Sequence, residues 1–166
     1  GWTRISLPAT PKMKRANLLE HAVGLLAGRP HSHAELSRKL KRLLLRRRAR
    51  EAVHAEAREA LHHLEASGAL CDKEFARWFV ASRQAHKPRS AHMVRQELAA
   101  KGVAYGVVSE AMAAYDEEAA CSDLALRKPG YTAPRLKKYL TNQGFPAGMV
   151  REVVRERAAE DAAVVE

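Results

Sequence analysis

One short phrase occurs three times in this chain and restricts what it can fold into. In each copy a basic residue and a proline lead into a hydroxyl residue, which is Ser32, Ser90 or Thr132. Proline disfavours helix in the residue before it, and a Ser or Thr oxygen can accept hydrogen bonds from the free amides of the next helical turn. The phrase therefore predicts a helix start, and its repetition predicts a tandem helical array.

Apolar residues follow each hydroxyl residue at the fourth and eighth positions along the chain. Side chains at this spacing lie on one face of a helix and should form its buried stripe. The second and third copies then close on Gly102 and Gly144, and glycine readily ends a helix in the left-handed conformation. The stripe positions are Leu36, Leu40, Val94, Leu98, Leu136 and Leu140.

These signals predict an all-α fold made of a tandem array of three three-helix repeats. No segment holds the alternation of a strand, and the valines recur at helical spacing. The copies are unevenly spaced, with 58 residues from Ser32 to Ser90 and 42 from Ser90 to Thr132, so the first repeat carries an extension. The expected organisation is a loose lead at 1–11, repeats at 12–70, 71–115 and 116–158, and an acidic helix end or tail at 159–166.

The charge predicts a polyanionic partner. Lys and Arg number 29 against 19 Asp and Glu, which gives a net charge of +10. Such a balance suits nucleic acid or an acidic protein surface, although solvated helix faces are the simpler alternative for any single residue. The first repeat holds a basic run without an acidic residue, most of it in the extension between Leu40 and Val53. The run consists of Arg38, Lys39, Lys41, Arg42, Arg46, Arg47, Arg48 and Arg50.

Catalytic and metal-binding patterns are missing from the sequence. The paired histidines, His31 with His33 and His62 with His63, are too close along a helix to converge on a metal, and no Gly-rich phosphate loop occurs. We therefore expect no metal, no cofactor and no enzymatic activity. No apolar run approaches the length of a membrane helix and no secretory signal is present, so the expected setting is soluble and intracellular, without a membrane partner.

Two smaller features have a structural interpretation. Cys71 and Cys121 each stand where a small apolar residue would serve, so both are expected to be buried free thiols of a reducing compartment. Phe75, Trp78 and Phe79 lie one turn apart in a helix expected to start at Asp72. Core packing explains these aromatic residues best, with a base-stacking platform as the alternative.

Four phrases resemble the RecX family in their order along the chain. Residues 68–76 resemble its "G-x-L-x-D-x-x-F-A" signature, and residues 97–103 its "E-L-x-x-K-G-[IV]" phrase. Residues 140–145 are similar to its "L-x-x-x-G-F" close, and residues 31–40 to its opening "x-S-x-x-E-L-x-x-K-L". One departure is the first repeat, which lacks the Lys-Gly-aromatic stop and carries residues 43–50 instead.

The resemblance implies an elongated, curved, monomeric regulator of the RecA recombinase. Such a protein binds the RecA–DNA filament and limits its growth, ATP hydrolysis and strand exchange in homologous recombination, DNA repair and the SOS response. It also implies contact with single- or double-stranded DNA through phosphates. The expected location is the bacterial cytoplasm, or an organelle nucleoid in a eukaryote.

Basic residues of all three repeats are the candidates for filament or DNA contact. Two rival functions stay open, a sequence-neutral DNA-binding protein and a helical scaffold for another acidic partner. Base reading by helix-turn-helix pairs is not expected, because mostly Ala, His, Met and Pro follow the three hydroxyl residues. The candidates are Arg38, Arg42, Arg46, Arg47, Arg48, Arg95, Lys101, Arg135, Lys137 and Lys138.

Overall fold

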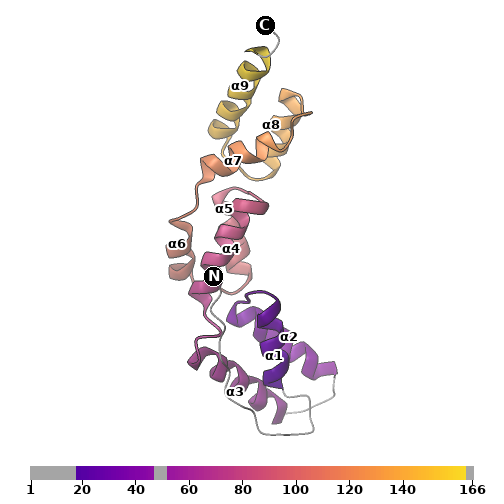
Figure 1. Cartoon of the computed structure of the whole chain (residues 1–166), viewed down its shortest axis with the longest axis vertical. Helices are drawn as coiled ribbons and strands as arrows, with labels where there is room; N and C mark the ends of the chain where they lie inside the picture. Colours follow the sequence, from indigo (N-terminus) through magenta and orange to yellow (C-terminus); the bar gives the residue numbers. More distant parts are fainter. Residues whose placement is uncertain (1–17, 47–51, 164–166) are drawn as a thin grey trace. The chain divides into compact units, whose positions relative to one another are not determined.

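The computed structural model describes residues 18–46 and 52–163, and this part of the chain forms nine helices and no strand (Figure 1). The all-α prediction is thereby confirmed. The expected lead at 1–11 lies outside the described residues. The helices are α1 (Leu18–Gly28), α2 (His33–Arg46), α3 (Ala52–Ala66), α4 (Asp72–His86), α5 (Ala91–Ala100), α6 (Tyr105–Met112), α7 (Glu117–Leu126), α8 (Ala133–Asn142) and α9 (Ala147–Ala163).

The chain divides into two compact units. Unit 1 comprises residues 1–75 together with 101–103, and unit 2 comprises residues 76–100 and 104–166. In unit 1, α1, α2 and α3 pack against one another around a leucine-rich core. Its buried members are Leu18, Ala22, Leu36, Leu40, Leu44, Ala57, Leu61, Leu64 and Leu70.

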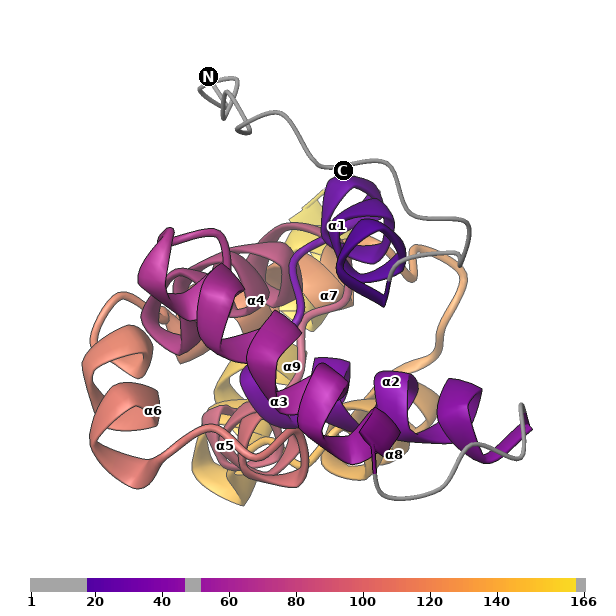
Figure 2. The same cartoon turned by 90° about the horizontal axis from the view of Figure 1, so that it is seen from below.

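Unit 2 contains the last five helices and most of α4. Within it α6 packs beside α5, as Figures 1 and 2 both show. The helices α7, α8 and α9 enclose a core that includes Cys121, Leu136, Leu140, Phe145 and Val150. Helix α9 continues through the acidic residues to Ala163.

The six stripe positions are buried as the repeated spacing predicts. Leu36, Leu40, Val94, Leu98 and Leu140 are 0% exposed and Leu136 is 2% exposed. Burying a leucine side chain contributes about 1.5–3 kcal/mol, so each central helix is held mainly through these residues. The repeated phrase therefore identifies the central helix of each three-helix repeat.

The hydroxyl residues cap two central helices but not the third. Ser32 Oγ accepts from the Glu35 amide at 3.1 Å, and Ser90 Oγ accepts from the Met93 amide at 3.2 Å. The expected cap at Thr132 is wrong, because its side chain makes no capping hydrogen bond and is exposed. Pro134 in the first turn lacks an amide hydrogen and removes one of the donors that a cap would satisfy.

Three glycines with positive φ follow helices, and two of them, Gly102 and Gly144, are the helix ends predicted from the repeats. Gly68, Gly102 and Gly144 have φ angles of 72°, 78° and 86°, in the left-handed region that costs other residues energy. Helix α2 has no such glycine and continues to Arg46 over 14 residues, whereas α5 and α8 have 10 each. Its extra turn places Leu44 in the core of unit 1 and leaves Leu45 73% exposed.

The structure corrects the expectation for one of the two cysteines. Cys121 is buried, and burial raises the pKa of its thiol to about 11 with a smaller contribution from Glu117, but Cys71 is exposed in the turn before α4. The Asp72 carboxylate accepts from the His33 amide of α2 at 2.7 Å. The amides in the first turn of a helix have no backbone partner within that helix, so a carboxylate from elsewhere in the chain can accept from them.

The aromatic residues of α4 serve packing. Phe75 is 1% exposed and Phe79 6% exposed. Trp78 is half-buried and contacts Phe79 edge-on, with ring centroids 6.4 Å apart. This arrangement agrees with the core interpretation of the cluster.

Candidate polyanion-binding surfaces

The central helix of unit 1 carries a basic exposed face. Helix α2 buries Leu36, Leu40 and Leu44 on one side and exposes Arg38 and Arg42 on the other. Arg38 Nε donates to the Ala34 carbonyl at 3.2 Å, which holds the guanidinium close to the helix. Two further exposed residues, Lys41 and Leu45, extend the surface. The side chain of Arg46 and all of Arg47 and Arg48 lie outside the described residues.

Unit 2 has two more central helices with exposed cations. Arg95 is exposed on α5, and α8 exposes Arg135, Lys137 and Lys138. The guanidinium of Arg135 lies over the Tyr131 ring, 4.2 Å from its centroid. The candidates of unit 2 therefore divide between two helices rather than converging on one point.

Lys101 lies in a contact that is central to unit 1. Its ammonium is 3.7 Å from a Glu35 carboxylate oxygen, and Glu35 also forms an ion pair with Arg29. Burial by itself raises the pKa of the Glu35 carboxyl, but the hydrogen bond from Arg29 and the charges of Lys101 and Arg29 outweigh it and lower that pKa. The Glu35 carboxylate therefore partly neutralises the Lys101 ammonium within unit 1.

The contact around Lys101 joins the start of α2 to the glycine turn after α5. Ser32 Oγ donates to the Lys101 carbonyl at 2.6 Å. A methyl group on Gly102 would come within 2.4 Å of the Ala34 Cβ, so only glycine allows this approach. We call the Ser32–Gly102 contact the first joint.

A buried histidine supports the first joint. The pKa of His31 is lowered, mainly by burial and also by the nearby charges of Arg29 and Lys39, so its neutral form is favoured. Its Nε2 is 2.6 Å from the Lys39 ammonium and accepts from it, and its Nδ1 donates to the Arg29 carbonyl at 2.8 Å. Burial likewise lowers the pKa of Lys39.

The same residue types meet in unit 2 at the start of α5. The Ser90 amide donates to the Gln143 carbonyl at 3.1 Å. A methyl group on Gly144 would lie 2.6 Å from Ser90 Oγ and 2.8 Å from the Met93 side chain. We call the Ser90–Gly144 contact the second joint.

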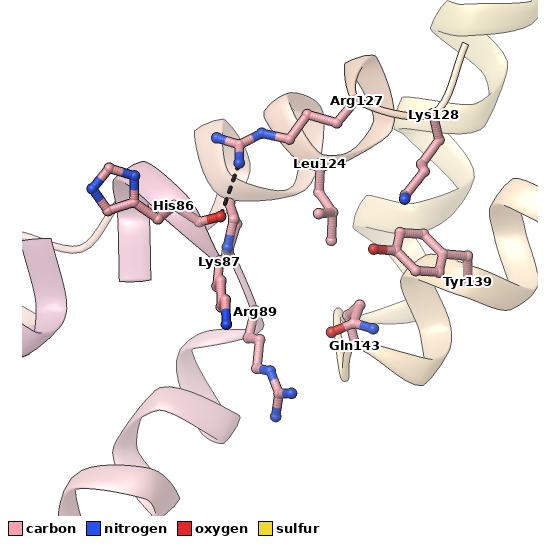
Figure 3. A pocket seen from close by; sticks show the side chains of 9 residues that line it. His86, Lys87, Arg89, Leu124, Arg127, Lys128, Tyr139 and Gln143 are labelled. Atoms are coloured by element: carbon pink, nitrogen blue, oxygen red, sulfur yellow. Dashed lines mark hydrogen bonds between the residues drawn. The ribbon is translucent and has the colours of Figure 1, made fainter. Parts of the chain in front are cut away.

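A cavity of about 300 Å³ lies beside the second joint (Figure 3). The basic-proline phrases of the second and third copies both line it. Sequence reasoning treated these phrases as helix punctuation and missed the cavity, although a basic residue before each proline was the available signal. The lining residues are His86, Lys87, Pro88, Arg89, Leu124, Arg127, Lys128, Tyr139 and Gln143.

The fold and these surfaces together define a class. The described part of the chain is a tandem array of three-helix repeats in which each central helix exposes cationic side chains. None of its helices is long and apolar enough to cross a membrane. No group of three His, Cys, Asp or Glu residues in the same part is placed to hold a metal ion.

Comparison with known proteins identifies the family. Residues 72–112 match the model of the second three-helix domain of RecX. The regulatory protein RecX of Prosthecochloris aestuarii is 35% identical over 83% of this chain and 91% of its own length. The regulatory protein RecX of Chlorobium phaeobacteroides is 32% identical over 80% of this chain and 88% of its own length. The regulatory protein RecX of Escherichia coli K12 is 31% identical over 86% of this chain and 93% of its own length. The chain belongs to the RecX family.

A solved structure agrees with this fold. The crystal structure of RecX from Lactobacillus salivarius superposes with a TM-score of 0.63 over 86% of this chain and 95% of that one. The two sequences are 17% identical, so this likeness concerns the fold alone.

Proposed function

We propose that this protein is a negative modulator of the RecA recombinase. It binds the RecA–DNA filament and limits filament growth, ATP hydrolysis and strand exchange in homologous recombination and DNA repair. The observation that carries the proposal is the family match, in which relatives named regulatory protein RecX align over four fifths or more of the chain.

The architecture supports a binding mode built from several modest contacts. The repeats at 12–70, 71–115 and 116–158 each supply a central helix with exposed cations. Contacts that act together through one chain strengthen each other by raising effective concentration, without any single strong site. In this proposal Arg38, Arg42 and the arginines at 46–48 serve the first repeat, Arg95 and Lys101 the second, and Arg135, Lys137 and Lys138 the third.

The protein acts in this proposal as a cytoplasmic monomer and without catalysis of its own. It changes ATP hydrolysis by binding the recombinase that carries out the hydrolysis. A second candidate, sequence-neutral DNA binding, is favoured by the net charge of +10. Phosphate contacts of this kind are independent of sequence and weaken with salt.

The deciding experiment measures ATP hydrolysis by RecA on single-stranded DNA at two salt concentrations. The protein is titrated below the RecA concentration. Suppression at substoichiometric amounts is expected, because a bound regulator at a growing filament affects many protomers. If ATP hydrolysis falls only when there is enough protein to coat the DNA, and high salt abolishes the effect, the DNA-binding candidate would be favoured. No effect on a cognate RecA would refute the proposal.

A triple variant tests the basic extension. We expect Arg46→Ala, Arg47→Ala and Arg48→Ala together to weaken filament or DNA binding while helicity and melting change little. A charge-matched control replaces three exposed arginines elsewhere, Arg58, Arg151 and Arg155, with alanine. Equal weakening by both variants would show that only net charge matters, and loss of helicity in the first would show that the run is structural.

A further inference from the structure

We infer that the basic cavity of unit 2 binds a phosphate group of nucleic acid. The inference deepens the proposed function and rests on it in one respect, namely that the nucleic acid is the DNA of the filament. The residues concerned, Lys87, Lys128, Tyr139 and Gln143, were not among the candidates drawn from the sequence.

Two ammonium groups at the cavity have no acidic partner. Within the described residues, neither Lys87 nor Lys128 forms an ion pair with a carboxylate. The two arginines differ, because Arg89 is 3.1 Å from Glu97 and Arg127 is 2.5 Å from Asp123. Two lysine charges therefore remain uncompensated at one concave surface, which favours an anion.

Neutral donors add to the two lysines. The Tyr139 hydroxyl and the Gln143 side-chain amide line the same cavity. Neither group makes a side-chain hydrogen bond to another described residue. Figure 3 shows Lys128, Tyr139 and Gln143 on one side of the cavity and Lys87 on the other. Several donors around one space suit the oxygens of a phosphate group.

The walls of the cavity are held in place by hydrogen bonds. The Tyr115 hydroxyl donates to the Arg89 carbonyl at 2.5 Å and accepts from the Arg89 amide at 3.3 Å. The Arg127 guanidinium donates to the carbonyls of His86 at 2.9 Å and Ala85 at 2.7 Å, which links the end of α7 to the end of α4. A site ordered before binding loses less conformational freedom when its ligand arrives.

The nearby tyrosine rings favour recognition of a phosphate over a base. The Lys128 ammonium lies 5.3 Å from the Tyr139 ring centroid and 5.8 Å from that of Tyr131. Arg135 lies over Tyr131 as well, at 4.2 Å. Because cations cover these ring faces, a base cannot stack there without displacing them. Contact with the backbone alone makes binding independent of sequence.

The test measures binding of the full chain to a labelled 20-nucleotide single strand and to a duplex of the same length, by fluorescence anisotropy over a salt series. The variant is Lys87→Gln with Lys128→Gln. The control, Arg151→Gln with Arg155→Gln, removes the same charge from exposed positions of α9. Circular dichroism checks that both variants fold. A further arm titrates ATP without DNA, to separate a backbone phosphate from that of a free nucleotide.

We expect the cavity variant to bind DNA about tenfold more weakly than the control, a loss of about 1.4 kcal/mol, because two cations of one phosphate site are removed. The slope of log affinity against log salt should fall by about 1 relative to the control. ATP binding that the same variant abolishes would also support a phosphate site, with a nucleotide as its source. Equal DNA affinities for the cavity variant and the control would overturn the inference. Because this assay contains no RecA, its failure leaves the effect on ATP hydrolysis to be judged separately.

Discussion

The two joints bring the same residue types together through different hydrogen bonds. In the first, the Ser32 hydroxyl donates to the Lys101 carbonyl. In the second, the Ser90 backbone amide donates to the Gln143 carbonyl, and its hydroxyl serves as the helix cap. A side-chain substitution can remove the first bond but not the second. Joints of similar composition should therefore differ in their sensitivity to mutation.

The glycines of the joints differ in the same way. A methyl group on Gly102 would meet the Cβ of Ala34, which is fixed to a helix backbone. A methyl group on Gly144 would meet the Met93 side chain and Ser90 Oγ, and a methionine can change rotamer. The first joint is therefore the more rigid contact and the second the more adaptable one.

The largest effect is expected from Leu98→Ala, because α5 leads from Ser90 of the second joint toward Gly102 of the first. Leu98 is fully buried, so the free energy of unfolding should fall by about 2–5 kcal/mol in denaturant titration. The exposed neighbour Gln96, changed to alanine, is the control. Equal effects of the two substitutions would show that Leu98 is not a core residue and would contradict the repeated spacing.

Alanine at Gly102 tests the rigid joint next. The positive φ should cost about 1–2 kcal/mol and the overlap with Ala34 about 1–3 kcal/mol more. Gly68→Ala is a matched control, because its φ is similar but no atom lies within 4 Å of the added methyl group. Gly144→Ala should fall between the two in thermal or denaturant unfolding. A Gly102→Ala protein no less stable than Gly68→Ala would contradict the close approach.

Replacing the capping serines with alanine should show a smaller difference in stability between the two joints. Ser32→Ala removes a cap and leaves the Lys101 carbonyl without its donor, so a loss of about 1–3 kcal/mol is expected. Ser90→Ala loses the cap alone, at about 0.5–2 kcal/mol. Thr132→Ala, at an exposed residue that caps nothing, should stay within about 0.5 kcal/mol. A larger loss of stability for Ser90→Ala than for Ser32→Ala would contradict the proposed difference between the two joints.

The smallest effect is a pH dependence that belongs to the first joint. Burial lowers the pKa of His31 from its usual 6.5, so as pH falls the unfolded chain binds this proton before the folded chain does. The stability that His31 contributes is therefore present above pH 6.5 and is lost below it. The second joint has Arg89 rather than a histidine at the matching position.

Unfolding free energies from pH 7.5 to 5.5 measure this difference. This range stays above the carboxylate region, where the lowered pKa of Glu35 acts. On acidification the wild-type protein should lose more stability than His31→Gln. The difference between the two slopes of unfolding free energy against pH should correspond to less than one extra proton bound by the unfolded chain. Parallel curves for the two proteins would show that His31 does not titrate differently in the folded chain.

Much of the fold was predictable because its signals are local. A buried stripe needs only the helical spacing of residues such as Leu36 and Leu40, and a helix end needs only a glycine that accepts positive φ. The capping role of Ser90 and the exposure of Arg38 follow from the same periodicity. The sequence thus determined the central helices, their buried faces and the cations on their exposed faces.

Tertiary structure alone decided which distant groups meet. Nothing near Asp72 shows that its carboxylate accepts the His33 amide, and nothing near Lys101 shows that Glu35 takes up part of its charge. The cavity needs Lys87 and Lys128 to approach across 41 residues of chain, an approach set by packing rather than by spacing. Local sequence determines helices because their hydrogen bonds connect near neighbours, whereas sites depend on how the buried faces of those helices pack.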